Sequence, residues 1–82
     1  MLTFYDFMIA RYLGKDNRYG DLAGDMHEDK DFPVKDNDRD SLRFYLVRCG
    51  ACNPCLETFS RAWRNYRRAL RKSQDATRTA TA

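Results

Sequence analysis

The chain has 82 residues, of which 33% are charged, and it carries a formal net charge of +3. A chain this short forms one domain and buries only about 60% of the surface that its unfolded form exposes, so we expect no deep catalytic cleft and no small-molecule substrate. No apolar run approaches the roughly 20 residues of a membrane-spanning helix, and the start lacks the features of a signal peptide. Together with three cysteines, an odd number, these features predict a cytoplasmic protein with no membrane association.

The first predicted helix begins near Phe4. Thr3 and Asp6 resemble a capping box, in which the threonine side chain accepts a hydrogen bond from a backbone N–H of the first turn. Gly14 tolerates a left-handed backbone conformation and should end the helix. The residues that suit its inward face are Phe4, Phe7, Met8 and Leu13.

A second, shorter helix is predicted from about Tyr19 to Lys30. Its apolar residues repeat at helical spacing: Tyr19, Leu22, Ala23 and Met26. Gly24 lies inside this helix at a cost of roughly 1 kcal/mol relative to alanine, which a closely passing helix would justify. Pro33 cannot continue a helix, and we expect the preceding Phe32 to plug the core from the loop.

A third helix should follow the turn from Asp36 to Asp40, with Asp38 or Asp40 as its N-cap. Its predicted inward face consists of Leu42, Tyr45, Leu46 and Cys49, with Phe44 beside it. The alternating aspartates resemble the opening of a calcium loop, but Ser41 and Val47 occupy the positions that an EF-hand reserves for glycine and glutamate. We therefore interpret the aspartates as turn and cap residues.

The last predicted helix, from Asn53 to Lys72, carries both the main apolar anchor and the densest positive charge. Asn53 can cap this helix, and Pro54 fits its first turn. Spacings of three and four residues give one apolar stripe: Leu56, Phe59, Trp63, Tyr66 and Leu70. The opposite side is basic and consists of Arg61, Arg64, Arg68, Arg71 and Lys72. Residues 73–82 have no apolar anchor, so we expect a domain of residues 1–72 and a disordered tail of residues 73–82.

Four helices with short links predict an all-α fold, a compact four-helix bundle with a long C-terminal helix. The expected core includes Phe4, Phe7, Leu46, Phe59 and Trp63. Several short segments together are similar to the YozE-like family of small bacterial proteins: Phe4-Tyr5-Asp6-Phe7-Met8, Asp21-Leu22-Ala23, Asp29 with Phe32-Pro33, Tyr45-Leu46, and Phe59, Ala62-Trp63 and Tyr66.

The resemblance to the YozE-like family covers roughly residues 4 to 70. It implies a fold like the sterile alpha motif (SAM), a bacterial source and no established activity. Two stretches depart from the family pattern. The region around Trp63 tends to be acidic in the family and is basic here, and the stretch from Cys49 to Cys55 replaces an ordinary loop.

Cys49, Cys52 and Cys55 form a C-x-x-C-x-x-C pattern, which is compatible with a zinc or iron–sulfur site. A closed structural site needs four ligands, and the sole histidine, His27, would have to supply the fourth from another helix. Free cysteine also packs as a small hydrophobe, and Cys49 falls on the apolar stripe of the third helix. We assign no metal and no cofactor, and the sequence leaves open whether these cysteines bind a metal with His27.

No catalytic residues are predicted. His27 has no serine or cysteine arranged with it for nucleophilic catalysis, and the chain contains no glycine-rich phosphate loop. The carboxylates near His27 are expected on the outer side of the second helix, not in a pocket: Asp25, Glu28, Asp29 and Asp31. The sequence therefore predicts a protein that is not an enzyme.

The charges are distributed unevenly along the chain. Residues 14–40 contain nine acids and five bases, whereas residues 56–82 contain seven bases and two acids. Like charges three or four residues apart oppose helix formation by about 0.2–0.5 kcal/mol per pair, and Glu57 can relieve only Arg61.

Three explanations for the basic side remain open. It is a solvated face held by core packing, or it contacts an acidic protein surface such as the middle of another copy, or it binds nucleic-acid phosphates. We expect protein contact or self-association, as SAM-type modules show as a class, with nucleic acid as the alternative. The expected contact residues are Arg61, Arg64, Arg68, Arg71 and Lys72.

Overall fold

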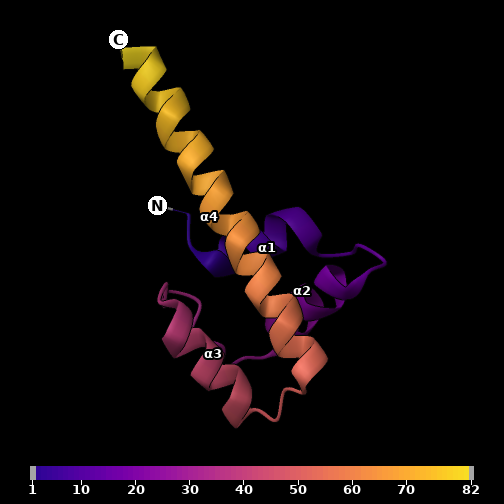
Figure 1. Ribbon diagram of the computed structural model, residues 1–82. Coiled ribbons are helices and arrows are strands. Elements are labelled where there is room, and N and C mark those ends of the chain that lie inside the picture. Colours follow the sequence, from indigo (N-terminus) through magenta and orange to yellow (C-terminus); the bar gives the residue numbers. More distant parts are fainter. Residues whose placement is uncertain (1, 82) are drawn as a thin grey trace.

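The computed structural model describes residues 2–81, with side chains up to Lys72. Over this range the chain forms four helices and no strand: α1 (Phe4–Tyr12), α2 (Arg18–Glu28), α3 (Arg39–Arg48) and α4 (Asn53–Thr81). Helix α4 contacts each of the other three helices, and α1 also packs against α2 (Figure 1). The predicted all-α bundle with a long last helix is confirmed, and α4 is the packing partner that its other helices share.

Helix α4 is longer than the sequence predicts. The expected end is Lys72, whereas α4 continues to Thr81. The division into a domain of residues 1–72 and a disordered tail of residues 73–82 stays a prediction, because the side chains from 73 onward and all of residue 82 lie outside the described part of the chain. Within residues 2–81, no helix is long and apolar enough to cross a membrane.

Helix α1 begins where the capping residues predict. The Thr3 Oγ1 atom accepts a hydrogen bond from the Asp6 N–H at 3.1 Å. Gly14 has a φ of +87°, a left-handed conformation that turns the chain away from α1. The expected inward position of Leu13 is wrong, because its backbone has already left the helix and its side chain is 40% exposed.

Helix α2 begins at Arg18 because Asn17 caps it, with the Asn17 Oδ1 atom accepting a hydrogen bond from the Gly20 N–H at 2.9 Å. The close approach that would justify Gly24 is absent, since no described atom beyond its chain neighbours and its own helix backbone lies within 4 Å of where an alanine Cβ would stand. The close approach is at Gly20 instead. A Cβ atom there would lie 1.9 Å from the carbonyl oxygen of Lys15.

The aspartates before α3 act as turn and cap residues, as predicted. Asp38 is the N-cap, and its Oδ2 atom accepts a hydrogen bond from the Ser41 N–H at 3.0 Å. Asp36 accepts hydrogen bonds from the Asp38 N–H, at 3.1 Å, and from the Ser41 hydroxyl. Both carboxylates are therefore engaged by the protein's own backbone and side chains.

The inward face of α3 is narrower than the sequence predicts. Leu42 is fully buried. Leu46 is expected in the core, but it is only half-buried and packs against the edge of the core. The predicted positions of Cys49 on this face and of Phe44 beside it are wrong, because both side chains are exposed, Phe44 by 64%. The reason is that, within the described residues, α3 packs against no helix other than α4, which covers one narrow stripe.

The centre of the core is a cluster of aromatic rings between α1 and α4, to which α2 adds Leu22, Ala23 and Met26 and α3 adds Leu42. Phe4 lies at its centre, with ring centroids 5.2 Å from Trp63, 5.3 Å from Phe59 and 5.7 Å from Tyr66. The predicted core positions of Phe4, Phe7, Phe59 and Trp63 are confirmed, and Phe32 is buried from the loop as expected. Ala62 is also fully buried, because a small side chain lets the helices approach α4 closely there.

Tyr66 joins three separate segments through its hydroxyl group. The hydroxyl donates a hydrogen bond to the Leu2 carbonyl oxygen at 2.7 Å and accepts one from the Asn37 Nδ2 atom at 2.7 Å. The Oδ1 atom of Asn37 in turn accepts a hydrogen bond from the Phe4 N–H at 2.9 Å. The start of the chain, the loop before α3 and the middle of α4 are thereby held together.

Substituting Tyr66 by phenylalanine should lower the free energy of unfolding by about 1–3 kcal/mol, because the polar groups that face its hydroxyl lose a partner. Chemical denaturation followed by circular dichroism measures the change. Tyr5→Phe is the control, since the Tyr5 hydroxyl makes no hydrogen bond to the described residues and its loss should cost less than about 0.5 kcal/mol. Equal losses for the two variants would contradict this role of Tyr66.

Candidate functional site

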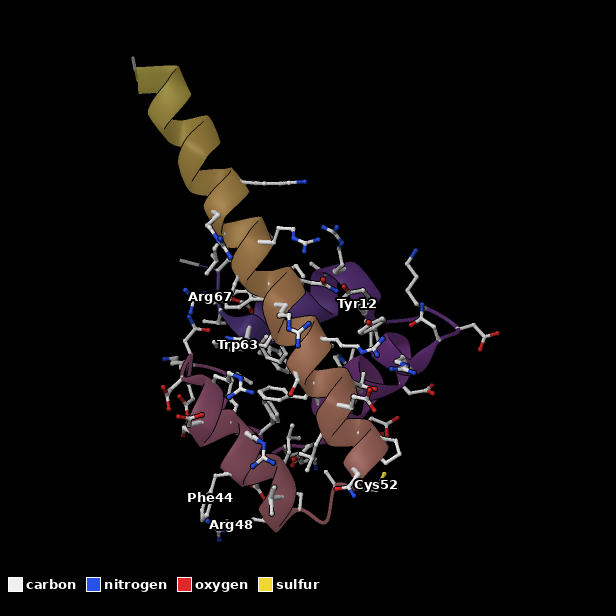
Figure 2. All side chains as sticks on the ribbon, viewed as in Figure 1. Tyr12, Phe44, Arg48, Cys52, Trp63 and Arg67 are labelled. Carbon is white, nitrogen blue, oxygen red and sulfur yellow. The ribbon has the colours of Figure 1, made fainter. Side chains whose placement is uncertain are left out.

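The basic side chains of α4 lie on its solvent side, opposite the core. Those predicted as contact residues are all exposed: Arg61, Arg64, Arg68, Arg71 and Lys72. Arg67 is also exposed and lies beside Trp63 in Figure 2. The sequence analysis missed Arg67, although it follows Trp63 by four residues, a spacing that places two side chains next to each other on a helix.

A shallow groove runs beside α4 on the side of α3. One hollow of about 370 Å³ is lined by Arg39, Trp63, Arg64, Arg67, Arg68 and Arg71, and we call these six residues the basic groove. A neighbouring hollow of about 250 Å³ shares Trp63, Arg67 and Arg71 and adds Asn37. Arg39 comes from the first turn of α3, so the groove combines cations from two helices. The sequence of α4 alone could therefore not show that Arg39 belongs to the basic groove.

Arg64 and Arg68 line the basic groove and also a second hollow. That hollow, of about 400 Å³, lies on the other flank of α4 and is also lined by Tyr19, Glu57, Ser60, Arg61 and Asn65, with Glu57 paired to Arg61. Both arginines contribute to both hollows. They are therefore the central cations of the surface.

Few of these cations have a carboxylate partner within the protein. Arg61 pairs with Glu57 at 3.3 Å, as the sequence predicts, and Arg39 pairs with Asp40 at 3.3 Å. Both pairs are solvent-exposed and contribute at most about 1 kcal/mol. Among the side chains of residues 2–72, no carboxylate lies within ion-pair distance of Arg64, Arg67 or Arg68. These three guanidinium groups can accept an external anion.

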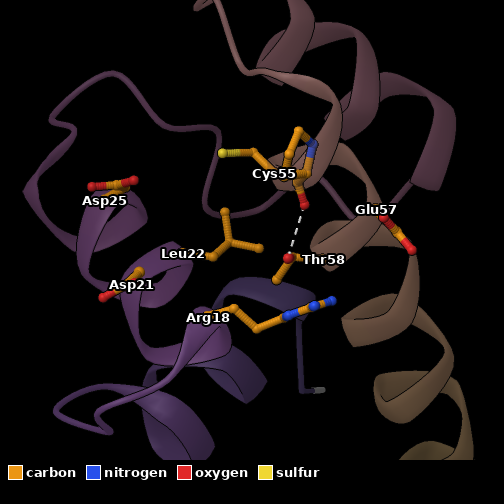
Figure 3. A pocket seen from close by; sticks show the side chains of 8 residues that line it. Arg18, Asp21, Leu22, Asp25, Cys55, Glu57 and Thr58 are labelled. Carbon is orange, nitrogen blue, oxygen red and sulfur yellow. Dashed lines mark hydrogen bonds between the residues drawn. The ribbon is translucent and has the colours of Figure 1, made fainter.

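Three exposed carboxylates without an ion-pair partner among the described side chains lie on α2. Asp21, Asp25 and Glu28 are exposed at helical spacing, and we call them the acidic patch. Asp21 and Asp25 line a hollow of about 200 Å³ beside the first turns of α4, together with Arg18 and Glu57 (Figure 3). The acidic patch therefore lies near the start of α4, whereas the basic groove follows its middle.

Asp29 does not belong to this free acidic surface, although the sequence placed it on the outer side of its helix. Its carboxylate is half-buried and accepts hydrogen bonds from the Tyr45 hydroxyl at 2.5 Å and from the Asp31 N–H at 3.0 Å. The hydrogen bond between Tyr45 and Asp29, together with burial and the nearby Cys49, raises the pKa of Tyr45 well above its ordinary value. The pair joins α3 to the end of α2.

The three cysteines lie around the connection between α3 and α4. Cys49 and Cys52 are exposed, Cys55 is half-buried, and the Sγ atoms of Cys52 and Cys55 are 3.2 Å apart. His27 is exposed in the last turn of α2. Within the described residues, the structure brings no three histidine, cysteine or acidic side chains together at metal-binding spacing.

Comparison with known protein families identifies the fold. The family model described as "YozE SAM-like fold" matches residues 3–68, which include α1, α2, α3 and α4 up to Arg68. The match confirms the family and the fold expected from the sequence. No curated protein and no solved structure matches this chain.

Proposed function

This chain belongs to the YozE SAM-like fold family, and we propose that it is a non-catalytic interaction module whose basic groove docks an acidic protein surface. The observation that carries the proposal is the position of Arg64 and Arg68 between two hollows, with no carboxylate partner among the described side chains. Guanidinium groups bind carboxylates in a two-pronged geometry. An acidic partner would also remove the repulsion between neighbouring arginines along α4.

The partner that we propose is the acidic patch of a second copy of the chain. The patch and the groove carry opposite charge and lie at different places along α4, so a pair of copies can join one to the other. In such a pair, one copy keeps a free acidic patch and the other a free basic groove. Further copies can bind there, so the assembly can grow into a chain. We place this assembly in the bacterial cytoplasm, as the family resemblance and the free thiols suggest.

Binding to nucleic-acid phosphates is the second candidate. Its support is the run of cations from Arg61 to Lys72, about 16 Å of helix, alongside which a nucleic-acid strand presents several phosphates. Two features favour the protein partner. Trp63 is only 8% exposed and cannot offer its ring face to a base, and the acidic patch would repel a polyanion.

Sizing the protein at several concentrations and salt levels, with and without a short DNA duplex, tests the proposal. We expect self-association without DNA that weakens as salt rises. The double substitution Arg64→Glu and Arg68→Glu should weaken this association by about tenfold or more while leaving the helical content unchanged.

Arg43→Glu with Arg48→Glu is the matched control, because it reverses two exposed charges of α3 outside the basic groove. This variant should associate like the parent. A size shift that occurs only with the duplex would replace the proposal by nucleic-acid binding. The absence of any salt-dependent shift in either case would mean that the arginines form a solvated face.

A further inference from the structure

Two thiols meet at the start of α4. Cys52 directly precedes Asn53, the first residue of the helix, and its carbonyl oxygen accepts a hydrogen bond from the Leu56 N–H at 3.0 Å. Cys55 lies in the first turn, three residues later, so the two side chains share one side of the helix start. Their Sγ atoms are 3.2 Å apart. We propose that Cys52 and Cys55 are a redox-active dithiol that reacts with disulfides and closes into an intramolecular disulfide bond.

The geometry permits the bond without a rearrangement of the fold. A disulfide needs an Sγ–Sγ distance of about 2.05 Å, so the sulfur atoms have to approach by only about 1 Å. Pro54, between the two cysteines, has no backbone N–H to lose at this position and holds the first turn in a helical conformation. Reduced and oxidised forms can therefore share the same helix start.

The surroundings give the two thiols different roles. The pKa of Cys52 is lowered by a hydrogen bond from the Cys55 thiol and further by the Cys55 backbone N–H at the positive end of the helix. The pKa of Cys55 is raised by the same thiol contact, by burial and by the carboxylate of Asp25. Cys52 is also the more exposed of the two. Cys52 is therefore the attacking thiolate, and Cys55 the thiol that resolves the intermediate.

The reaction balances with a low-molecular-weight disulfide, RSSR, as the oxidant. The Cys52 thiolate attacks one sulfur of RSSR, the S–S bond breaks, and a mixed disulfide with Cys52 forms as RS⁻ leaves. Cys55 then loses its proton and attacks the Cys52 sulfur, which releases the second RS⁻. The protein dithiol loses two electrons, RSSR gains them, and the two thiol protons end on two molecules of RSH.

Cys49 is the third thiol of this region but is not required. It lies at the end of α3 and lines the same hollow of about 380 Å³ as Cys52 and Cys55, with Met26 and Phe32 on the apolar wall. This hollow gives a small disulfide access to both thiols. A metal site is the competing use of three cysteines, but among the described side chains, those of residues 2–72, no three histidine, cysteine or acidic groups gather at metal-binding spacing.

The test incubates the reduced full chain with glutathione buffers of graded redox ratio, blocks the remaining thiols with an alkylating agent and maps them by mass spectrometry. We expect a linked Cys52–Cys55 peptide and an alkylated Cys49. The variant Cys49→Ser should behave like the parent. Cys55→Ser should accumulate a mixed disulfide with glutathione at Cys52, and Cys52→Ser should lose the intramolecular bond.

A second measurement tests the assigned roles. In the reduced parent, the alkylation rate of Cys52 should reach half its maximum at a lower pH than that of a free thiol, whose pKa is about 8.5. A disulfide that involves Cys49, or oxidation only between molecules, would overturn the proposal. So would one equivalent of tightly bound zinc that protects all three thiols. None of these results depends on whether the basic groove binds a partner.

Discussion

Replacing Trp63 by alanine should lower the free energy of unfolding by about 3–5 kcal/mol. The indole is 8% exposed and packs against rings of both α1 and α4, with centroids 5.2 Å from Phe4 and 5.2 Å from Tyr66. Those neighbours are themselves held by other contacts, so the space that the indole leaves cannot close fully. Because small domains are stable by only about 5–15 kcal/mol, this one substitution removes a large share of the total.

Chemical denaturation followed by circular dichroism measures the loss. Phe44→Ala is the control, because it removes an aromatic ring that is 64% exposed and should change the free energy of unfolding by less than about 0.5 kcal/mol. If the two variants lose equal stability, the aromatic cluster around Phe4 is not the core. Trp63 also lines the basic groove, so binding by this variant is not a test of the proposed function.

The features that the sequence predicted well are local ones. Thr3 and Asp38 cap the helices that follow them because a cap needs only a side-chain oxygen and a nearby N–H. The apolar stripe of the last helix places Phe59, Trp63 and Tyr66 in the core because spacings of three and four fix a helix face wherever the helix lies. Local spacing was thus enough for four helices and most of the core, whereas the cap expected at Asn53 is wrong, because Asn53 already lies inside α4.

The features that the sequence could not give depend on which helix meets which. Cys49 has the spacing of a buried residue, but α3 has one helical neighbour and its last turn is uncovered. Arg39 is distant in sequence from the arginines of α4, and only the fold brings it to the basic groove. Tyr45 and Asp29 pair across two elements for the same reason.

The candidate sites divide α4 into two parts with different chemistry. Its N-terminal end holds the Cys52–Cys55 pair, where the helix terminus favours a thiolate. Its middle holds Arg64 and Arg68, whose aliphatic stems and charged ends face outward beside the aromatic core. The same helix can serve both because the cysteine pair lies at its N-terminal end, beside α2 and α3, whereas Arg64 and Arg68 lie farther along on the side that core packing leaves free.

Glycine in α2 offers a matched pair of substitutions with opposite expected signs. Gly20→Ala should lower the free energy of unfolding by about 2–4 kcal/mol, since overpacking costs about 1–3 kcal/mol and a weakened N-cap about 1 kcal/mol. The new Cβ would stand 1.9 Å from the Lys15 carbonyl oxygen and 2.7 Å from its carbonyl carbon. Either the α1–α2 connection or the start of α2 has to move, and the bond from the Gly20 N–H to Asn17 is strained with it.

Gly24→Ala, one helical turn later, should instead raise the free energy of unfolding by up to about 1 kcal/mol. Beyond its chain neighbours and the backbone of α2 itself, no described atom lies within 4 Å of its Cβ position, so alanine gains helix propensity without a clash. Chemical denaturation of the two variants side by side measures both changes in the free energy of unfolding. Helix propensity alone would predict that both substitutions raise it. A stabilised Gly20→Ala variant would show that the backbone of Lys15 does not approach Gly20 this closely.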